Sequence, residues 1–406
     1  MGVTLSAPIR SKWLQRRGDK NYMVASADMQ GFRVEMEDAL TTALKMSTKH
    51  PDRGFFGVYD GHGGARCSKY LETAMVNAIG NLDGGDIIAH VASLDFLPSQ
   101  TDPTKEDVIK KTCKAVDAEF LKREQEREDG STAVFCIVTP QEGKDTFEII
   151  TANIGDSRAL LIRADGKVEP LTEDHKPNNE EEMDRITRAG GSVSSCRVDG
   201  QLALSRAIGD WNYKDNPDLR PEDQKVIPIP DITKVTASKG DTLLICCDGL
   251  FEQMSNEEVG GYVYKQLEET KYADPAEVLK GLLDLSLEKG SKDNMSAMTV
   301  CFRDGTKYHK SGGEFVPGPF HQHKHNEKFK KAYLNDAKRH GFEEEKLMSV
   351  VPKPPSGYKP QEEPEEMENP MQQMISKALE GQMGEDVKQR LLMAMFARAQ
   401  GPPGPQ

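Results

Sequence analysis

The sequence has few of the features that mark secreted, membrane-spanning or nucleic-acid-binding proteins. Its seven cysteines are odd in number and form no CxxC pair, and no secretory leader is visible, which favours free thiols in a reducing compartment. No apolar run approaches the roughly 20 residues that a membrane-spanning helix needs. The formal net charge of −13 gives nucleic-acid binding no electrostatic support. We therefore expect a monomeric, cytoplasmic protein that does not bind nucleic acid.

Two catalytic motifs are also absent. No arginine stands six positions after any cysteine, so the sequence lacks the C-x₅-R arrangement in which an arginine cradles a nucleophilic thiolate. Cys246 and Cys247 lie in an apolar run and are expected to be buried structural thiols. The GxxxxGK[ST] loop of P-loop nucleotidases is missing too. Neither cysteine-based nor P-loop chemistry is therefore expected.

What the sequence does contain is a metal-binding pattern in FFGVYDGHGG, residues 55–64. An apolar strand delivers Asp60, Gly61 and His62 to one point and then turns. Asp60 can ligate a cation, and Gly61 lets a backbone carbonyl approach the same cation. His62 adds a group whose ordinary pKa is about 6.5. The segment predicts a metal site with a proton donor beside it.

Further acids follow the same pattern along the chain. Each lies at a strand end or turn, in QGFRVEMEDA, NIGDSRALL, LLICCDGLFE and SKDNMSAMTV; they are Glu37, Asp38, Asp156, Asp248 and Asp293. Any one of them alone is ordinary turn chemistry. Together with Arg33 they predict oxygen-ligated divalent cations that act on an anionic substrate.

These segments resemble one family closely. The ordered set RVEMEDA, VYDGHGG, DGSTAV, ANIGDSRALL, EDHKP, RAGGSV, LALSRAIGDWNYK, CCDGLFE and KDNMS is similar to the metal-dependent serine/threonine protein phosphatases of type 2C. The resemblance spans residues 22–303, the length of one large domain. It implies an α+β fold, a sandwich of two antiparallel β-sheets flanked on both outer faces by antiparallel helices.

The resemblance also implies a role for each site residue. Asp60 would bridge two Mg²⁺ or Mn²⁺ ions; Glu37 and the Gly61 carbonyl would complete one shell, and Asp248 with Asp293 the other. A water activated between the ions would attack phosphoserine or phosphothreonine of a phosphorylated protein. Three further side chains have roles by the same resemblance. Arg33 would grip the phosphate, His62 would protonate the leaving oxygen, and Asp38 would hold water in the second shell.

A third, weaker cation is implied at Asp156 and Asp248. Many family members have an aspartate four residues after the second of these, where this chain has Glu252. The longer Glu252 side chain is either a ligand with altered geometry or a solvated carboxylate. His175 in EDHKP is expected to be a loop residue and not a ligand.

Two other functions stay open at this point. One is a catalytically silent, phosphoprotein-binding scaffold of the same fold, and the other is a phosphomonoesterase for small molecules. By the same resemblance, the segment 197–230 would be a flap beside the site, where Arg206, Trp211 and their neighbours would shape substrate entry. For Trp211 and Tyr213 the alternative is simple packing beneath a long loop.

The sequence outside residues 22–303 is predicted to be accessory. Residues 1–21 are expected to form a basic arm, in which MGVTLS matches the myristoylation pattern at Gly2. A basic group would supply the second signal for reversible membrane contact; it comprises Arg10, Lys12, Arg16, Arg17 and Lys20. Residues 304–370, including the HQHKH run, are expected to be a loosely ordered polar linker. Residues 371–400 predict an amphipathic helical extension.

Local patterns predict several elements. Helices are expected over 65–79, after a capping box at 104–107, and from Pro275 to Gly290. Asp165-Gly166 predicts a hairpin. Strands are expected in GFFGVYD, STAVFCIVT, TFEIITANI, RALLIRA, TLLICC and SAMTVCF.

Overall fold

Two antiparallel sheets form the centre of the fold. The five-stranded sheet has the order β16-β10-β9-β6-β5. Its strands are β5 (Ala39–Ala43), β6 (Gly54–Tyr59), β9 (Ala133–Pro140), β10 (Thr146–Ile154) and β16 (Asp231–Ser238). The seven-stranded sheet has the order β12-β11-β17-β18-β3-β2-β19. Its strands are β2 (Lys12–Gly18), β3 (Met23–Met29), β11 (Arg158–Ile162), β12 (Val168–Pro170), β17 (Thr242–Cys246), β18 (Met295–Cys301) and β19 (Gly313–Val316).

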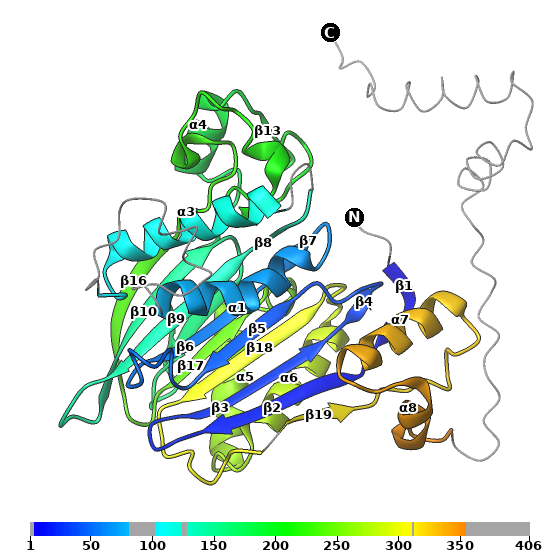
Figure 1. Cartoon of the computed structure of the whole chain (residues 1–406). Coiled ribbons are helices and arrows are strands. Elements are labelled where there is room, and N and C mark those ends of the chain that lie inside the picture. Colours follow the sequence, from blue (N-terminus) through cyan, green and yellow to red (C-terminus); the bar gives the residue numbers. More distant parts are fainter. Residues whose placement is uncertain (1–3, 81–101, 124–127, 311, 355–406) are drawn as a thin grey trace, which may run out of the picture. The chain divides into compact units, whose positions relative to one another are not determined.

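Helices cover the outer faces of both sheets (Figure 1). Helices α1 (Arg66–Gly80) and α3 (Glu106–Arg123) pack on the five-stranded sheet, and α5 (Asn256–Glu269) and α6 (Pro275–Lys289) pack on the seven-stranded one. Central strands such as β6, β17 and β18 are buried along their whole length because both of their faces are covered. The predicted α+β sandwich is confirmed, and so are the six predicted strands.

The local predictions for helix ends are mostly confirmed. Helix α6 begins at Pro275 with the Asp274 side chain accepting from the Ala276 N–H, and Gly290 ends it in a left-handed conformation. The hairpin at Asp165-Gly166 joins β11 to β12. The capping box expected at 104–107 is wrong. The Thr104 hydroxyl donates to Asp102, 2.8 Å away, and α3 begins at Glu106.

The strand register brings distant chain segments to one end of the sandwich. Ala39 at the start of β5 pairs with Tyr59 at the end of β6. Cys246 at the end of β17 pairs with Arg158 at the start of β11. On its other side Cys246 pairs with Ala297, near the start of β18. The loops that follow β6 and β17, and those that precede β5, β11 and β18, therefore meet at the same end.

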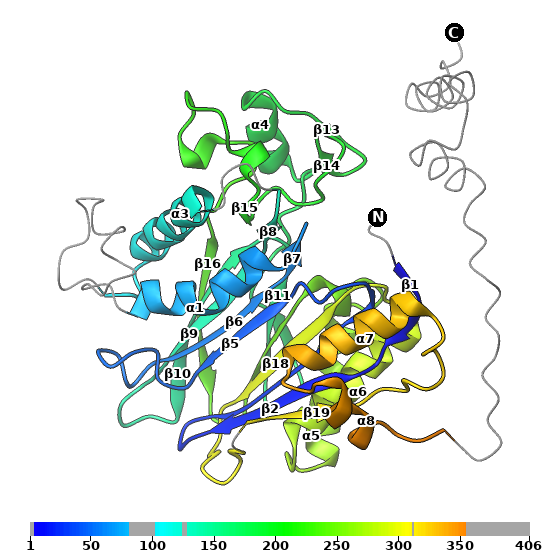
Figure 2. The same ribbon diagram turned by 45° about the vertical axis from the view of Figure 1, so that its right-hand side comes forward.

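Smaller elements stand at that end (Figure 2). A three-stranded sheet has the order β15-β8-β7, formed by β7 (Gly61–His62), β8 (Gly130–Ser131) and β15 (Ile208–Gly209). The flap contains α4 (Glu180–Arg188), β13 (Val193–Ser194) and β14 (Arg197–Val198), with short 3₁₀ turns at Trp211–Tyr213 and Pro221–Asp223. A third 3₁₀ turn, Asp248–Leu250, follows β17. This end of the sandwich carries the acids of the sequence pattern.

The prediction of a separate basic arm over residues 1–21 is wrong. Strand β1 (Thr4–Ile9) pairs with β4 (Gly31–Arg33), and β2 is an inner strand of the seven-stranded sheet. Lys12 lies 2.8 Å from Asp284, and Arg16 binds Asp274 at 2.9 Å. Because alternate residues of β2 face inward, part of the expected basic group is buried and neutralised.

The prediction of a loose linker from residue 304 is also wrong for its described part. Strand β19 extends the seven-stranded sheet, and α7 (Glu327–Arg339) and α8 (Glu344–Val350) follow it. Helix α7 packs on β1 with a core of its own that includes Phe329, Tyr333 and Leu347. The described residues up to Lys353 therefore belong to one compact unit.

The computed structural model describes residues 4–80, 102–123, 128–310 and 312–354. Gly2 and the predicted helical extension at 371–400 lie outside the described residues. None of the helices within the described ranges combines the length and apolar character needed to cross a bilayer.

The end of α7 generates a prediction about stability and pH. The His340 ring stacks on Trp13 with centroids 4.4 Å apart, and its Nε2 lies 3.1 Å from Arg339 Nη2. Burial and the Arg339 charge lower the pKa of His340 to about 4. The unfolded chain, with an ordinary pKa near 6.5, binds the proton first as the pH falls. This histidine should therefore reduce stability as the pH drops from about 6.5 to 4.

His340→Phe keeps an aromatic ring on Trp13 and removes this titration. Between pH 6.5 and 4 the free energy of unfolding of the parent should fall more than that of the variant, by up to about 3 kcal/mol. Urea unfolding of both proteins at a series of pH values measures the difference. Parallel pH profiles would contradict a neutral, buried His340.

Candidate metal centre

The predicted ligands gather where strands of both sheets end. Asp60 follows β6, Asp248 follows β17, and Asp293 precedes β18. Glu37 and Asp38 lie just before β5, whose first residue is in register with the last residue of β6. Each acid is thus carried by a buried strand, and the register of the strands brings the acids together.

The carboxylates of these acids are buried close to one another, so their negative charges repel. Burial raises the pKa of Asp60 well above its ordinary value, and the negative charges of Asp38, Asp248, Asp293 and Asp156 raise it further. The pKa of Asp248 is raised by burial and by two of the same neighbours. Such carboxylates are ionised at neutral pH only if positive charge compensates them. Hard divalent cations with oxygen ligands fit this donor set.

Asp38 supports the same conclusion. Its side chain is only 3% exposed, yet within the described ranges neither carboxylate oxygen has a hydrogen-bond partner. Asp38, Asp60 and Cys247 place ligand atoms within 4.8 Å of one another. Burial raises the pKa of the Cys247 thiol, whose sulfur also accepts from the Ser296 N–H at 3.1 Å. The thiol therefore stays protonated, and the oxygens are the ligands available to a cation.

Gly61 allows a close approach of two backbones. A Cβ at this position would lie 2.4 Å from the Glu37 carbonyl oxygen, so a larger residue would push the two segments apart. The neighbouring Asp60 is fixed by Thr132, whose hydroxyl accepts from the Asp60 N–H at 3.0 Å. The Gly61 backbone is therefore held beside Glu37, where a cation could bind both.

Arg33 lies at the rim of the cluster, at the end of β4. Its Nη2 is 2.5 Å from Asp293 Oδ2, and its side chain is 34% exposed. The guanidinium is thus positioned beside a predicted metal ligand and also reaches solvent. This placement suits an anion that contacts the cluster and the arginine together.

His62 has a partner that the sequence analysis did not identify. Its Nε2 lies 2.9 Å from both carboxylate oxygens of the buried Asp210. A Cβ at Gly130 would lie 2.3 Å from Asp210 Oδ2 and 2.6 Å from His62 Nε2. Only glycine in β8 leaves room for this pair. Burial lowers the pKa of His62, but the Asp210 charge and hydrogen bond outweigh it, so the pKa is raised.

The remaining predicted ligands have other partners. Asp156 is ion-paired with Lys176. The Glu252 carboxylate accepts from the Ser291 hydroxyl at 3.0 Å and from the Lys292 N–H at 3.2 Å. The Glu252 side chain is also exposed to solvent, as the alternative of a solvated carboxylate predicts.

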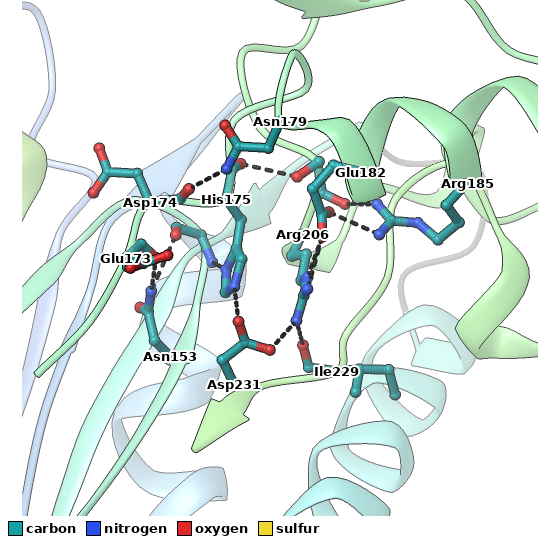
Figure 3. A network of polar contacts seen from close by, with 12 residues as sticks. Asn153, Glu173, Asp174, His175, Asn179, Glu182, Arg185, Arg206, Ile229 and Asp231 are labelled. Carbon is teal, nitrogen blue, oxygen red and sulfur yellow. Dashed lines mark hydrogen bonds and ion pairs between the residues drawn. The ribbon is translucent and has the colours of Figure 1, made fainter. Parts of the chain in front are cut away.

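A polar network joins the flap to the sheets (Figure 3). Glu182 accepts from Arg206 Nη2 and from Arg185 Nη1, both at 2.7 Å. Arg206 also binds Asp231 at 2.7 Å, and the other oxygen of Asp231 lies 3.1 Å from His175 Nε2. The Arg206 side chain thus holds the flap instead of facing a substrate.

Other flap residues lie closer to the cluster. Tyr213 lines a cavity of about 350 Å³ beside His62, together with Leu202 and Glu128. Trp211 is half-buried in the short turn that follows Asp210. Of the three flap residues singled out in the sequence, Tyr213 has the position from which it could contact a substrate.

Two functional candidates were missed by the sequence analysis. Asp210 and Lys176 stand inside the segments LALSRAIGDWNYK and EDHKP, which were recognised only as marks of resemblance. A signal existed for Asp210, since an acid follows a glycine there as it does at Gly155-Asp156 in NIGDSRALL. None of these spacings shows which acid meets which base, because the partners come from loops about 20 to 150 residues apart.

Comparison with known proteins identifies the family. Residues 22–295 match the family described as Protein phosphatase 2C. The chain is 36% identical over 316 residues to Protein phosphatase 1A of Homo sapiens, covering 76% of this chain and 78% of that protein. It is 37% identical over 313 residues to Protein phosphatase 1B of Bos taurus, covering 76% of this chain and 62% of that protein. The chain thus spans less than two thirds of the bovine relative.

Solved structures agree with these sequence matches. A phosphatase from a pathogenic strain of Toxoplasma gondii has a TM-score of 0.61 at 28% identity, covering 76% of this chain and 99% of that one. A C. elegans sex determining protein shares the fold with a TM-score of 0.53 at 23% identity, covering 71% of this chain and 66% of that one. This chain belongs to the protein phosphatase 2C family of serine/threonine protein phosphatases.

Proposed function

We propose that this chain hydrolyses phosphoserine and phosphothreonine monoesters of phosphorylated proteins, using two Mg²⁺ or Mn²⁺ ions and a histidine as general acid. The observation that carries the proposal is the cluster of buried, mutually repelling carboxylates around Asp60. Family membership supports the phosphatase activity, and the charge of the cluster supports the cations.

The residues divide into those that hold cations and those that handle the substrate. Asp60 would hold both ions, because four other acids act on it. Glu37 and the Gly61 carbonyl would hold one ion with it, and Asp248 and Asp293 would hold the other. When bound, the ions would neutralise the phosphate and lower the pKa of the attacking water. Asp38, whose oxygens lack partners among the described residues, would accept hydrogen bonds from that water.

Arg33 and His62 would act on the substrate itself. The fork of the Arg33 guanidinium can bind phosphate oxygens while Asp293 holds it in place. Asp210 engages Nε2 of His62, which leaves Nδ1 of the ring as the atom that donates a proton to the departing serine or threonine oxygen. Asp210 is thus a positioning residue that favours the protonated form of His62.

Two alternatives are less well supported. A catalytically silent scaffold would be expected to have lost an acid or the histidine, and this chain keeps Arg33, Glu37, Asp60, His62, Asp248 and Asp293 at one end of the sandwich. A phosphomonoesterase for small molecules would use the same cations. Comparing hydrolysis of phosphopeptides with that of sugar phosphates distinguishes it from a protein phosphatase.

Metal dependence tests the proposal first. A phosphothreonine peptide should be hydrolysed with Mn²⁺ or Mg²⁺ and not with excess chelator. Asp60→Asn removes the charge that the two cations share, so activity should be abolished while the fold is retained. Phosphate release and circular dichroism are measured on both proteins at saturating Mn²⁺. Normal turnover by folded Asp60→Asn protein would rule out the bridging role.

The His62 and Asp210 pair gives a graded prediction. His62→Gln should reduce turnover of a phosphoserine peptide by roughly 10² to 10⁴, and Asp210→Asn by about 10- to 100-fold. Both should affect an aryl phosphate much less, because its leaving oxygen needs no proton. Asp199→Asn is the control, since Asp199 lines the same cavity but pairs with Lys225. Equal losses on both substrates would assign the pair to the cation site instead.

We also propose reversible membrane contact through acylation of Gly2, with a different basic surface from the one expected. The exposed lysines of the α7 segment are Lys324, Lys328, Lys331 and Lys338. This helix packs on β1, where Asn326 donates to the Ser6 hydroxyl at 3.1 Å. The α7 lysines therefore lie close to the strand that begins two residues after Gly2.

Vesicle binding of the acylated chain tests this contact. Gly2→Ala should lower binding to phosphatidylserine vesicles without changing activity in solution. Lys324→Gln with Lys331→Gln should weaken binding about fivefold per lysine, and less at high salt. Lys105→Gln with Lys111→Gln is the control pair, because both residues are exposed near or on α3. Equal binding by the Gly2→Ala variant and its parent would show that MGVTLS is a chance match.

A further inference from the structure

A cavity beside His62 has a lining that the proposed chemistry does not use. Its volume is about 350 Å³, within the range of ligand-binding pockets. It is lined by His62 and Gly63, and by flap residues that include Leu202 and Tyr213. Figures 1 and 2 both show the flap next to the end where β7 and β8 lie. The cavity therefore lies between the flap and the histidine of the proposed reaction.

Two of the three acids that line this cavity already have basic partners. Both oxygens of the buried Asp210 lie 2.9 Å from His62 Nε2. The carboxylate of Asp199 is paired with Lys225 at 2.9 Å. The charges of these two acids are therefore compensated within the protein.

The third acid, Glu128, has a neutral partner. Its Oε1 accepts from the side-chain amide of Asn212 at 3.1 Å, and its side chain is exposed. In the part of the chain that the structure describes, no basic side chain forms an ion pair with Glu128. Arg197 of the flap donates to the Gln201 carbonyl at 2.6 Å and is not among the residues that line the cavity. The cavity thus keeps one uncompensated negative charge.

The rest of the lining suits the stem of a long basic side chain. Leu202 and Tyr213 are half-buried, and the methylene groups of an arginine or lysine can pack on their apolar surface. The Tyr213 ring can also attract a cation to its face. Gln201 adds a side-chain carbonyl that can accept a hydrogen bond. An acidic side chain in the same place would be repelled by Glu128.

His62 connects the cavity with the reaction. Its Nε2 is held by Asp210, so its Nδ1 would donate the proton to the departing serine or threonine oxygen. The phosphorylated residue must therefore lie against the same ring that lines the cavity. Because consecutive Cα atoms are about 3.8 Å apart, a residue one or two positions away in a peptide can extend a long side chain into the cavity.

From these contacts we infer that Glu128 selects protein substrates that carry arginine or lysine one or two residues from the phosphorylated serine or threonine. The inference rests on the proposed phosphatase function, whose substrate class it narrows. Glu128 acts on substrate binding and not on the chemical step, so it is a specificity-determining residue. It stands immediately before the DGSTAV segment, outside the motifs that carry the family resemblance.

A set of phosphothreonine peptides tests the inference. The peptides share an alanine-based sequence, and each carries arginine, alanine or glutamate at one position, from two before to two after the phosphothreonine. The kcat and KM of the full chain are measured for each peptide at saturating Mn²⁺. At one or more positions, arginine should give a kcat/KM about fivefold higher than alanine, mainly through a lower KM, and glutamate should give the lowest value.

A charge reversal separates electrostatic selection from other effects. Glu128→Gln should remove most of the arginine preference. Glu128→Lys should reverse it, so that the glutamate peptide becomes the better substrate at the same position. Because the preference is a ratio measured within each protein, a general loss of activity cannot imitate this reversal. Glu142→Lys is the control, because Glu142 is an exposed residue of the β9–β10 hairpin and does not line the cavity.

Each outcome has a distinct meaning. Reversal by Glu128→Lys, with Glu142→Lys behaving as the parent does, supports the inference. Equal kcat/KM values for the three kinds of peptide would overturn it, and so would an arginine preference that persists in Glu128→Lys. A reversal in Glu142→Lys as well would assign the preference to the net charge of the chain and overturn it too. Hydrolysis without any preference defeats this inference alone, whereas no hydrolysis of any peptide by the parent defeats the proposed function.

Discussion

Electrostatic repulsion among buried carboxylates is the constraint on which the rest of this structure depends. Asp38, Asp60, Asp248 and Asp293 come from different loops, and burial with mutual repulsion raises the pKa of Asp60 well above its ordinary value. Folding alone gives no reason to collect these charges, since buried unpaired charge is costly. The cost is offset by the covered strands that deliver the acids and by whatever positive charge binds among them. Cation binding and stability of this end of the sandwich are therefore coupled.

The chain meets this constraint with bases at fixed places around the cluster. Arg33 contacts Asp293, and Lys176 contacts Asp156. Both bases compensate acids at the periphery, whereas no basic side chain among the described residues forms an ion pair with the central Asp60. Basic side chains of the protein thus compensate the acids at the edge of the cluster, and the acids around Asp60 remain available to bind cations. The buried network of Glu182, Arg206 and Asp231 extends the same principle into the flap, where paired charges fix a segment that has only a small apolar core.

The sequence was sufficient for the elements whose signals are local. Buried strands such as β6 and β17 are continuous apolar runs in the sequence and can be recognised there. The acids that follow them could be identified as site candidates because each stands at the end of such a run. It was insufficient where the partner is far along the chain. Arg16 counted as a free basic residue because Asp274 is 258 residues away. Asp210 went unassigned because its contact with His62 depends on Gly130 lacking a side chain. Neither the number of charged residues nor the spacing of motifs along the chain shows which distant residues form such pairs.

The family match ends at residue 295, but the compact unit continues through α7 and α8 to Lys353. Asp28 on β3 is buried, and burial raises its pKa while Arg339 from α7 lowers it through a contact of 2.9 Å. Asp28 is in register with Ser296, and both line a cavity of about 530 Å³ together with Asp38. Without α7, Asp28 would be a second unpaired acid beside the acids of the metal centre. Because that would add to the repulsion there, the helices beyond the matched region belong to the physical basis of the site and not to a linker.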